Sequence, residues 1–100
     1  MLNINDYKHI HCIGIGGIGL SAVAEICKSR GFEVSGSDMK TSEMTDHLTE
    51  QGITVHIGHA AENINGADLV VYSAAVSLEN PEIVAAKENG IQLATRAEAL

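Results

Sequence analysis

The glycine-rich segment from Gly14 to Gly19 has the residue types and spacing of an anion-binding loop. Its G-x-G-x-x-G pattern follows the apolar run 10–13 and leads into a helical pattern over residues 20–27. In such a unit, the first glycine allows a tight turn, the second lets a phosphate approach the backbone, and the third lets helix pack closely on strand. The free N–H groups of the helix start favour an anion. We predict a phosphate-binding loop lined by Gly14, Gly16, Gly17, Ile18 and Gly19; a tight turn without a ligand is the alternative.

A carboxylate follows the second predicted strand at a distance typical of dinucleotide-binding folds. Asp38 lies 19 residues after Gly19, in the sequence Gly36-Ser37-Asp38. An acid at this place accepts hydrogen bonds from ribose hydroxyls and disfavours a cofactor with a 2′-phosphate. Asp38 is therefore a candidate ligand contact, with a solvated turn carboxylate as the alternative.

Three further polar residues follow predicted strands, and each has two open interpretations. His59 is either a ligand contact or a surface-loop histidine, and Arg96 either binds a phosphate or carboxylate or begins a last helix. Ser73 places a hydroxyl at the same edge but lacks the G-x-S-x-G setting of a nucleophile. His9 and His11 share a strand face without a third residue at metal-ligand spacing. With no nucleophile–base pair and no G-x-x-x-x-G-K-[ST] loop in the sequence, we predict binding without catalytic residues.

Composition narrows the class of protein. One hundred residues, 45% hydrophobic and 19% charged, are typical of a single globular domain. A formal charge of −7 with only six Lys and Arg residues argues against nucleic-acid binding. No apolar run is long enough for membrane insertion. Two cysteines without C-x-x-C spacing, and no secretory signal, predict a cytoplasmic setting.

The elements that must position these residues alternate between strand and helix. Residues 1–8 are expected to form a loose arm, and residues 9–13 the first strand. A helix is predicted over 17–30, with Ile18, Ala22, Ile26 and Cys27 as its buried stripe. Gly31, Gly52 and Gly90 are each followed by an apolar–polar–apolar triplet, which predicts a left-handed helix end and then a strand.

Two caps and one apolar run complete the expected pattern. Thr41 or Ser42 caps a second helix, and Asn80-Pro81 begins a later one whose Glu79, Glu82 and Glu88 are interpreted as a solvated face. The run 67–72 suits a central strand covered on both faces. The order predicts an α/β fold, a Rossmann-like doubly wound parallel sheet of about five strands over residues 9–100. Right-handed crossovers bring the carboxyl ends of the strands, and with them the candidate residues, to one crevice.

Three segments together resemble the Mur ligase family: residues 11–19, 35–38 and 80–86. The resemblance covers about residues 9–100 in the same order and similar spacing. It implies that the chain is the first of three domains and binds UDP-N-acetylmuramate. A second domain would hold ATP and Mg²⁺, and a third would help to bind L-alanine. The implied reaction activates the muramic acid carboxyl as an acyl phosphate, which the amine of L-alanine attacks, in peptidoglycan precursor synthesis. We expect this chain alone to hold no cofactor and to be inactive.

By position, the resemblance also implies roles for individual residues. Gly16, Gly17 and Gly19 would face the diphosphate, and Asp38 with the backbone of Met39 would address the uridine. His59 and Ser73 would line the same crevice. Ala74 replaces a serine that is common in the family, so no polar recognition is assigned to it. The alternatives are an NAD-binding domain of a dehydrogenase or regulatory protein, a structural domain without a ligand, and a sister ligase that attaches a whole peptide.

Overall fold

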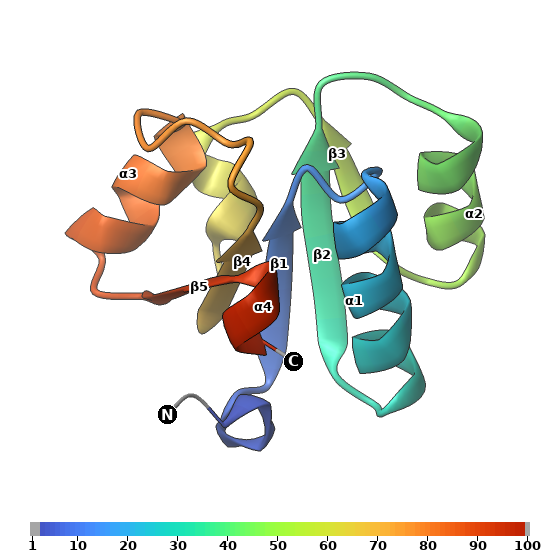
Figure 1. Cartoon of the computed structure of the whole chain (residues 1–100), viewed down its shortest axis with the longest axis horizontal. Coiled ribbons are helices and arrows are strands. Elements are labelled where there is room, and N and C mark those ends of the chain that lie inside the picture. Colours follow the sequence, from blue (N-terminus) through green and yellow to red (C-terminus); the bar gives the residue numbers. More distant parts are fainter. Residues whose placement is uncertain (1–2, 100) are drawn as a thin grey trace.

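Five parallel strands form one sheet in the order β3-β2-β1-β4-β5, with helices on both faces (Figure 1). The computed structural model describes residues 3–99. The strands are β1 (His9–Ile13), β2 (Glu33–Asp38), β3 (Thr54–Ile57), β4 (Leu69–Tyr72) and β5 (Gln92–Thr95). The helices are α1 (Ile18–Ser29), α2 (Glu43–Glu50), α3 (Pro81–Glu88) and α4 (Arg96–Ala99), with 3₁₀ turns η1 (Ile4–Asp6) and η2 (Ala61–Ile64). The predicted doubly wound sheet is confirmed.

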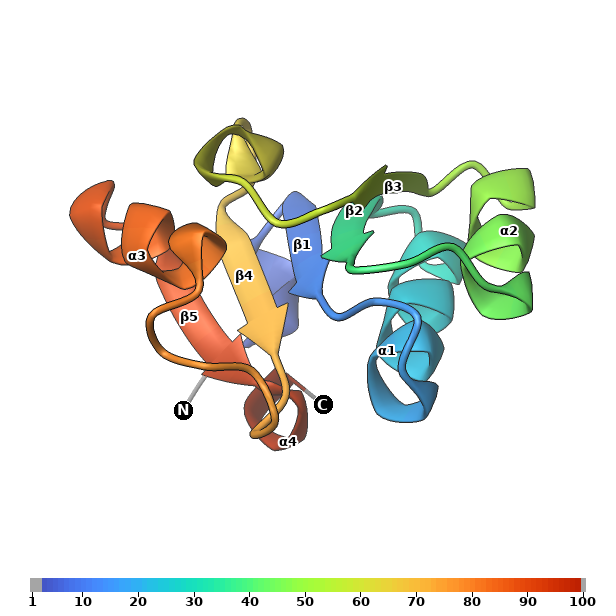
Figure 2. The ribbon, with the colours of Figure 1, turned by 90° about the horizontal axis from the view of Figure 1, so that it is seen from above.

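The helices pack on the two faces of the sheet through two apolar clusters. Ile10 and Cys12 of β1 pack in the cluster that contains the buried residues of α1, α2 and α4. Ile13 belongs to the second cluster, with residues of η2 and α3. Seen from above in Figure 2, α1 and α4 lie on one side of the sheet and α3 on the other. Ile10 and Cys12 thus face one layer of helices and Ile13 the other, because successive strand side chains point to opposite faces.

The buried stripe of α1 differs from the prediction. Ile18 is 92% exposed, and Ile26 and Ala22 are also exposed. The buried residues are instead Leu20, Ser21, Val23, Ala24 and Cys27. Leu20, Val23, Ala24 and Cys27 also follow helical spacing, so periodicity alone allowed two adjacent stripes. Contact with the sheet selects the one that includes Leu20, and Ile18 is left at the edge of the loop.

The helix ends follow the predicted local chemistry. Ser42 caps α2 by accepting a hydrogen bond from the Thr45 N–H, and Asn80 caps α3 by accepting one from the Glu82 N–H. Gly31, Gly52 and Gly90 adopt positive φ angles of 94°, 88° and 69°. These glycines end the helices because a left-handed residue without a Cβ costs little there.

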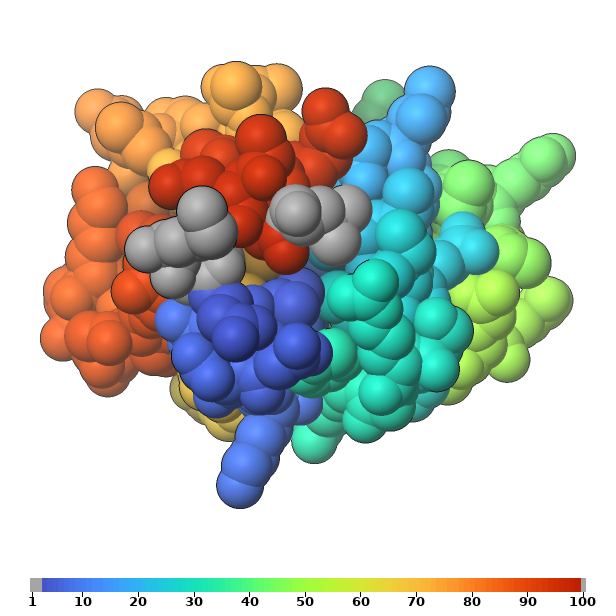
Figure 3. Space-filling model, turned by 60° about the horizontal axis from the view of Figure 1, so that its bottom comes forward, coloured from blue at the N-terminus to red at the C-terminus, as the bar shows by residue number. Residues whose placement is uncertain are grey.

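The segment before β1 is more ordered than a loose arm. Residues 4–6 form the turn η1, and Ile4 and Tyr7 pack against the core, while Met1 and Leu2 lie outside the described residues. The backbone N–H groups of Lys8 and His9 donate to the Asp68 carboxylate. Figure 3 shows this N-terminal segment, in blue, and α4, in red, on the same face of the molecule. None of the helices within residues 3–99 has the length and hydrophobicity of a membrane span.

Gly36 in the middle of β2 allows the glycine loop to lie directly against the sheet. A Cβ at this position would lie 2.4 Å from Ile15 Cδ1 and 2.7 Å from the carbonyl oxygen of Cys12. The second atom is backbone and cannot rotate away. Because Gly36 has no side chain, Ile15 of the loop can bury its side chain over β2.

We predict that Gly36→Ala destabilises the fold by about 1–3 kcal/mol, because the added methyl group overpacks a rigid contact. Urea unfolding followed by circular dichroism measures the change. Gly17→Ala is the matched control, since Gly17 has a φ of −70° and its added Cβ would lie 3.3 Å from its nearest neighbour, the Gly14 carbonyl oxygen. Equal stability of Gly36→Ala and the wild type would show that β2 and the loop do not need this close approach.

Candidate functional site

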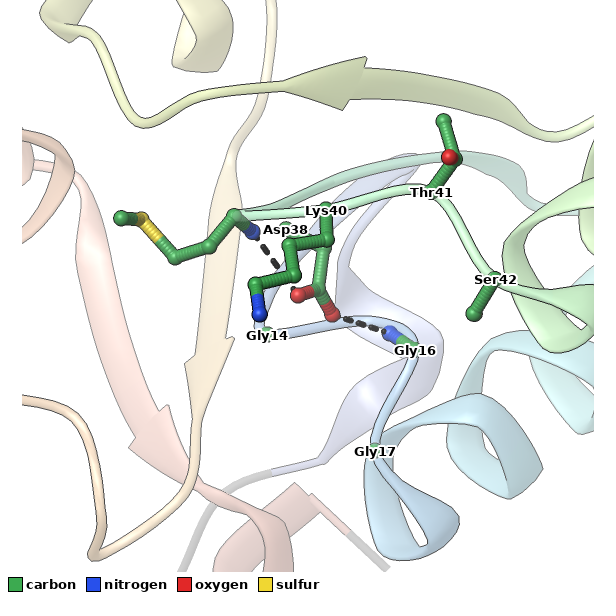
Figure 4. A pocket seen from close by; sticks show the side chains of 8 residues that line it. Gly14, Gly16, Gly17, Asp38, Lys40, Thr41 and Ser42 are labelled. Atoms are coloured by element: carbon green, nitrogen blue, oxygen red, sulfur yellow. Dashed lines mark hydrogen bonds between the residues drawn. The ribbon is translucent and has the colours of Figure 1, made fainter.

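The end of β2 holds the first half of the glycine loop. The Ser37 carbonyl accepts hydrogen bonds from Gly14 N (2.8 Å) and Ile15 N (3.0 Å). The next residue, Asp38, accepts from Gly16 N through Oδ2 at 2.8 Å, as Figure 4 shows. Gly14 has a φ of 79°, as the predicted tight turn requires. Two consecutive residues of β2 therefore fix three consecutive N–H groups of the loop.

The second half of the loop leaves its N–H groups available to a ligand. Gly17 is the N-cap of α1, and its own N–H donates to the Gly14 carbonyl. Within residues 3–99, no hydrogen-bond partner is found for the N–H groups of Ile18, Gly19 and Leu20. These groups point out of the first turn of a helix, where the dipole favours an anion. The free donors of the predicted loop thus lie at residues 18–20 rather than at its first glycines.

Two hollows meet at the loop. One, of about 500 Å³, is lined by Gly14, Gly16, Gly17, Asp38, Met39, Lys40, Thr41 and Ser42 (Figure 4). The other, of about 400 Å³, is lined by Gly14, Gly17, Ile18, Gly19, Leu20, Ser73 and Arg96. Because both hollows include Gly14 and Gly17, they adjoin along the loop. Together they offer an anion site next to a pocket that carries a carboxylate.

Arg96 lines the second hollow, and its positively charged side chain lies beside Gly19 at the start of α1. A Cβ on Gly19 would lie 2.6 Å from Arg96 Cδ and 2.9 Å from Nε. The third glycine therefore makes room for the Arg96 side chain, whereas the sequence pattern predicted close packing of helix on strand. A guanidinium beside free N–H groups is a strong arrangement for a phosphate.

The structure brings most of the predicted residues to these hollows. The backbone N–H of Met39 donates to Asp38 Oδ1 at 2.8 Å, so both oxygens of that carboxylate are oriented by the backbone. Ser73 and Arg96 line the second hollow with the loop. His59 lines neither hollow; its Nδ1 lies 2.8 Å from Ser37 Oγ. The predicted crevice is thus a groove along the loop, and His59 lies behind it.

A buried carboxylate, Glu82, lies behind the loop. The sequence pattern predicts a solvated helix face that contains Glu79, Glu82 and Glu88, and for Glu82 this prediction is wrong, because its side chain is 0% exposed. Its Oε1 lies 2.6 Å from His11 Nε2 and 2.8 Å from Ser37 Oγ. Its Oε2 accepts from Asn63 Nδ2 at 2.9 Å and from the Ala60 N–H at 3.2 Å. The acid is buried because four donors from outside α3 replace the water that it loses.

Polar strand residues extend this cluster, and their pattern was the available signal. His9 and His11 of β1 both lie 2.8 Å from Ser35 Oγ of β2, and Ser37 lies one pleat further along the same strand. Polar residues that alternate within two buried strands predict a polar stripe between sheet and helix, and buried polar groups need hydrogen-bond partners. This pattern predicts a hydrogen-bonding side chain on the helix that covers the stripe, and Glu82 of α3 is that side chain. Within residues 3–99, no group of three or more His, Cys, Asp or Glu residues has a metal-binding arrangement.

The surroundings of Glu82 set its protonation state. Burial alone would raise the pKa of this carboxyl group. The hydrogen bonds from His11, Asn63 and Ser37, together with the charge interaction with His11, outweigh burial and lower the pKa from 4.5 to about 2. Glu82 is therefore ionised at neutral pH although it is buried.

Fold and site together define a doubly wound α/β class of protein, with a glycine loop and a carboxylate at the carboxyl edge of its sheet. The family model described as "Mur ligase family, catalytic domain" matches residues 9–100. The chain belongs to the Mur ligase family.

Curated relatives and solved structures that match this chain include UDP-N-acetylmuramate ligases. The UDP-N-acetylmuramate–L-alanine ligase of Alkaliphilus metalliredigens is 58% identical over 96 residues, which are 96% of this chain and 21% of the relative. The structure of UDP-N-acetylmuramate-alanine ligase from Thermotoga maritima matches with a TM-score of 0.86 and 42% identity, over 91% of this chain and 21% of that one. The UDP-N-acetylmuramate:L-alanyl-gamma-D-glutamyl-meso-diaminopimelate ligase from Neisseria meningitides matches with a TM-score of 0.81 and 35% identity, over 89% and 28%. The chain thus spans about a fifth of the length of the curated relatives it matches.

The lowered pKa of Glu82 predicts acid-sensitive stability. Because the folded-state pKa lies below the unfolded value of 4.5, the contribution is complete above that pH and is lost as the pH falls towards 2. A shift of this size corresponds to the order of 3 kcal/mol. The stability difference between wild type and Glu82→Gln, measured by urea unfolding, should shrink over this range.

Glu79→Gln is the control for this measurement, since Glu79 is exposed on the same segment. Its pH profile should follow that of the wild type. A constant difference between wild type and Glu82→Gln from neutral pH down to about pH 2 would contradict the prediction.

Proposed function

We propose that this chain is the nucleotide-sugar-binding part of an ATP-dependent ligase that joins L-alanine to UDP-N-acetylmuramate. The observation that carries the proposal is the row of free N–H groups at residues 18–20 beside Arg96, within a chain of the Mur ligase family. This arrangement suits a diphosphate, which carries the charge that the loop and the guanidinium both favour. Family membership then favours a UDP-sugar over other diphosphates.

The diphosphate would lie in the second hollow. Its oxygens would accept hydrogen bonds from the N–H groups of Ile18, Gly19 and Leu20 and pair with the guanidinium of Arg96. Ser73 adds a hydroxyl on the same side. The chain has a formal charge of −7, so anion binding depends on these local donors rather than on its overall charge.

The uridine would occupy the first hollow, beside Asp38. The carboxylate keeps lone pairs free after accepting from the N–H groups of Gly16 and Met39, and it can accept from ribose hydroxyls. Both backbone contacts hold the carboxylate at a fixed angle. Asp38 would thereby connect the position of the nucleoside to the position of the loop.

The activity belongs to a longer protein in this proposal. ATP and Mg²⁺ would supply the chemistry that activates the muramic acid carboxyl, at sites in the four-fifths of the relatives that this chain does not match. The residues of this chain would bind and orient the nucleotide sugar, and none of them would act as a catalytic residue. The cell compartment in this proposal is the cytoplasm.

Two alternatives follow from specific observations. The likeness to the Neisseria ligase, at 35% identity, keeps a sister enzyme that attaches a peptide to the same nucleotide sugar as the second candidate. Both candidates share the UDP-sugar site proposed here. An NAD-binding domain would use the same loop and Asp38, but family membership does not favour it.

Calorimetric titration of the chain with UDP-N-acetylmuramate, UDP and NADH in parallel tests the ligand class. We expect heat of binding with the two uridine ligands and none with NADH. A preference for NADH would overturn the proposal in favour of a dinucleotide-binding domain. Absence of binding to all three would contradict a nucleotide-sugar site in this chain by itself.

Asp38→Ala should weaken UDP binding by about 1–3 kcal/mol, the scale of a lost hydrogen bond to a charged group. Asp38→Asn should lose less, because its amide oxygen still accepts from the Gly16 N–H. Calorimetry measures both, and Asp46→Ala, an exposed acid of α2, is the control. Unchanged affinity in Asp38→Ala would remove this carboxylate from the site.

A further inference from the structure

We propose that Glu82 is a positioning residue for the nucleotide-sugar site: its buried carboxylate fixes Ser37, and Ser37 in turn fixes the glycine loop and Asp38. The inference rests on the proposed function for the identity of the ligand. Glu82 touches neither hollow, so it would act only through the residues that it holds.

The first step is the contact between α3 and the end of β2. Ser37 is 0% exposed, and its hydroxyl lies 2.8 Å from Glu82 Oε1. A carboxylate only accepts, so the single hydroxyl hydrogen of Ser37 points to Glu82. The same hydroxyl oxygen can then only accept from His59 Nδ1, which lies 2.8 Å away. Glu82 thus sets the direction of both hydrogen bonds of the Ser37 side chain.

The second step is the contact between Ser37 and the loop. The ladder between β1 and β2 ends at the pair Ile13–Ser37, because β1 turns away at Gly14. Beyond this pair, the Ser37 carbonyl bonds to the N–H groups of Gly14 and Ile15 instead of to a strand. The position of Ser37 therefore determines where the loop leaves the sheet. The next residue, Asp38, holds Gly16 in the same way.

The third step ties the neighbouring segment to the same acid. Asn63 Nδ2 donates both to Glu82 Oε2 and to the Gly58 carbonyl, at 2.9 Å each. The Gly58 N–H donates to the Asp38 carbonyl at 2.7 Å. Glu82 therefore reaches Asp38 by two routes, one through Ser37 and one through Asn63 and Gly58. Movement of the Glu82 carboxylate would therefore displace Asp38 through both routes.

The chain offers a matched pair of variants to test this role. Ser35 and Ser37 lie on the same strand and face, both are buried, and each hydroxyl joins two polar side chains. Of these two serines, only Ser37 forms hydrogen bonds with Glu82 and with the loop. Ser35 joins His9 to His11, away from the carboxyl edge.

The experiment measures UDP-N-acetylmuramate affinity by calorimetry and backbone amide resonances by ¹⁵N nuclear magnetic resonance, in wild type, Ser37→Ala, Ser35→Ala and Glu82→Gln. We expect Ser37→Ala to bind about tenfold more weakly, and Ser35→Ala to stay within about twofold of the wild type. Glu82→Gln keeps the side-chain volume but loses one acceptor oxygen, and it should resemble Ser37→Ala. The amide resonances of residues 14–16 should move in Ser37→Ala and remain in place in Ser35→Ala.

The imidazole of His59 gives a second signature. The wild type should carry its proton on Nδ1, which long-range ¹H–¹⁵N spectra detect. The Nε2–H tautomer would overturn the hydrogen-bond direction on which the inference rests.

The outcomes separate this inference from the proposed function. If the wild type does not bind UDP-N-acetylmuramate, the proposed function fails, and the amide resonances of the loop still judge the effect of Ser37. Equal loss of affinity in both serine variants would assign the cluster a purely structural role. Unchanged loop resonances in Ser37→Ala would overturn the positioning role in either case.

Discussion

The buried, hydrogen-bonded carboxylate of Glu82 is the constraint on which the carboxyl edge of the sheet depends. An isolated buried charge would cost far more free energy than a domain of this size can lose, so its donors must be in place when the chain is folded. Those donors come from β1, β2 and the segment between β3 and β4. One side chain therefore imposes a relative position on four parts of the chain.

That constraint lies on the opposite face of the sheet from α1, yet it bears on the loop that precedes α1. The sheet transmits it, because alternate residues of β2 face different layers. Ser37 faces Glu82 with its side chain and the loop with its carbonyl, whereas the Asp38 side chain faces the loop. A polar layer behind the sheet can thus position an anion site in front of it.

The distribution of charge explains how an acidic protein could hold a diphosphate. The site takes its positive character from the first turn of α1 and from Arg96 rather than from a basic surface. Gly19 matters for this reason, since a side chain there would displace Arg96. Five of the thirteen acidic residues lie at exposed positions of α2, α3 and α4: Glu43, Asp46, Glu50, Glu88 and Glu98.

The sequence by itself determined the elements, their order and the loop. Glycine at left-handed helix ends, Asn80-Pro81 and the apolar alternation in β1 act over a few residues, so local patterns contain them. Only the tertiary structure decided which stripe of α1 is buried, which loop N–H groups remain free and that Glu82 is internal. These depend on contacts between segments as far apart as His11 and Glu82, and burial of a charge is decided by donors that are distant in sequence. Helical periodicity assigns Glu82 to a face of α3. Burial of that face is stable only because polar side chains of β1 and β2 form hydrogen bonds with the Glu82 carboxylate.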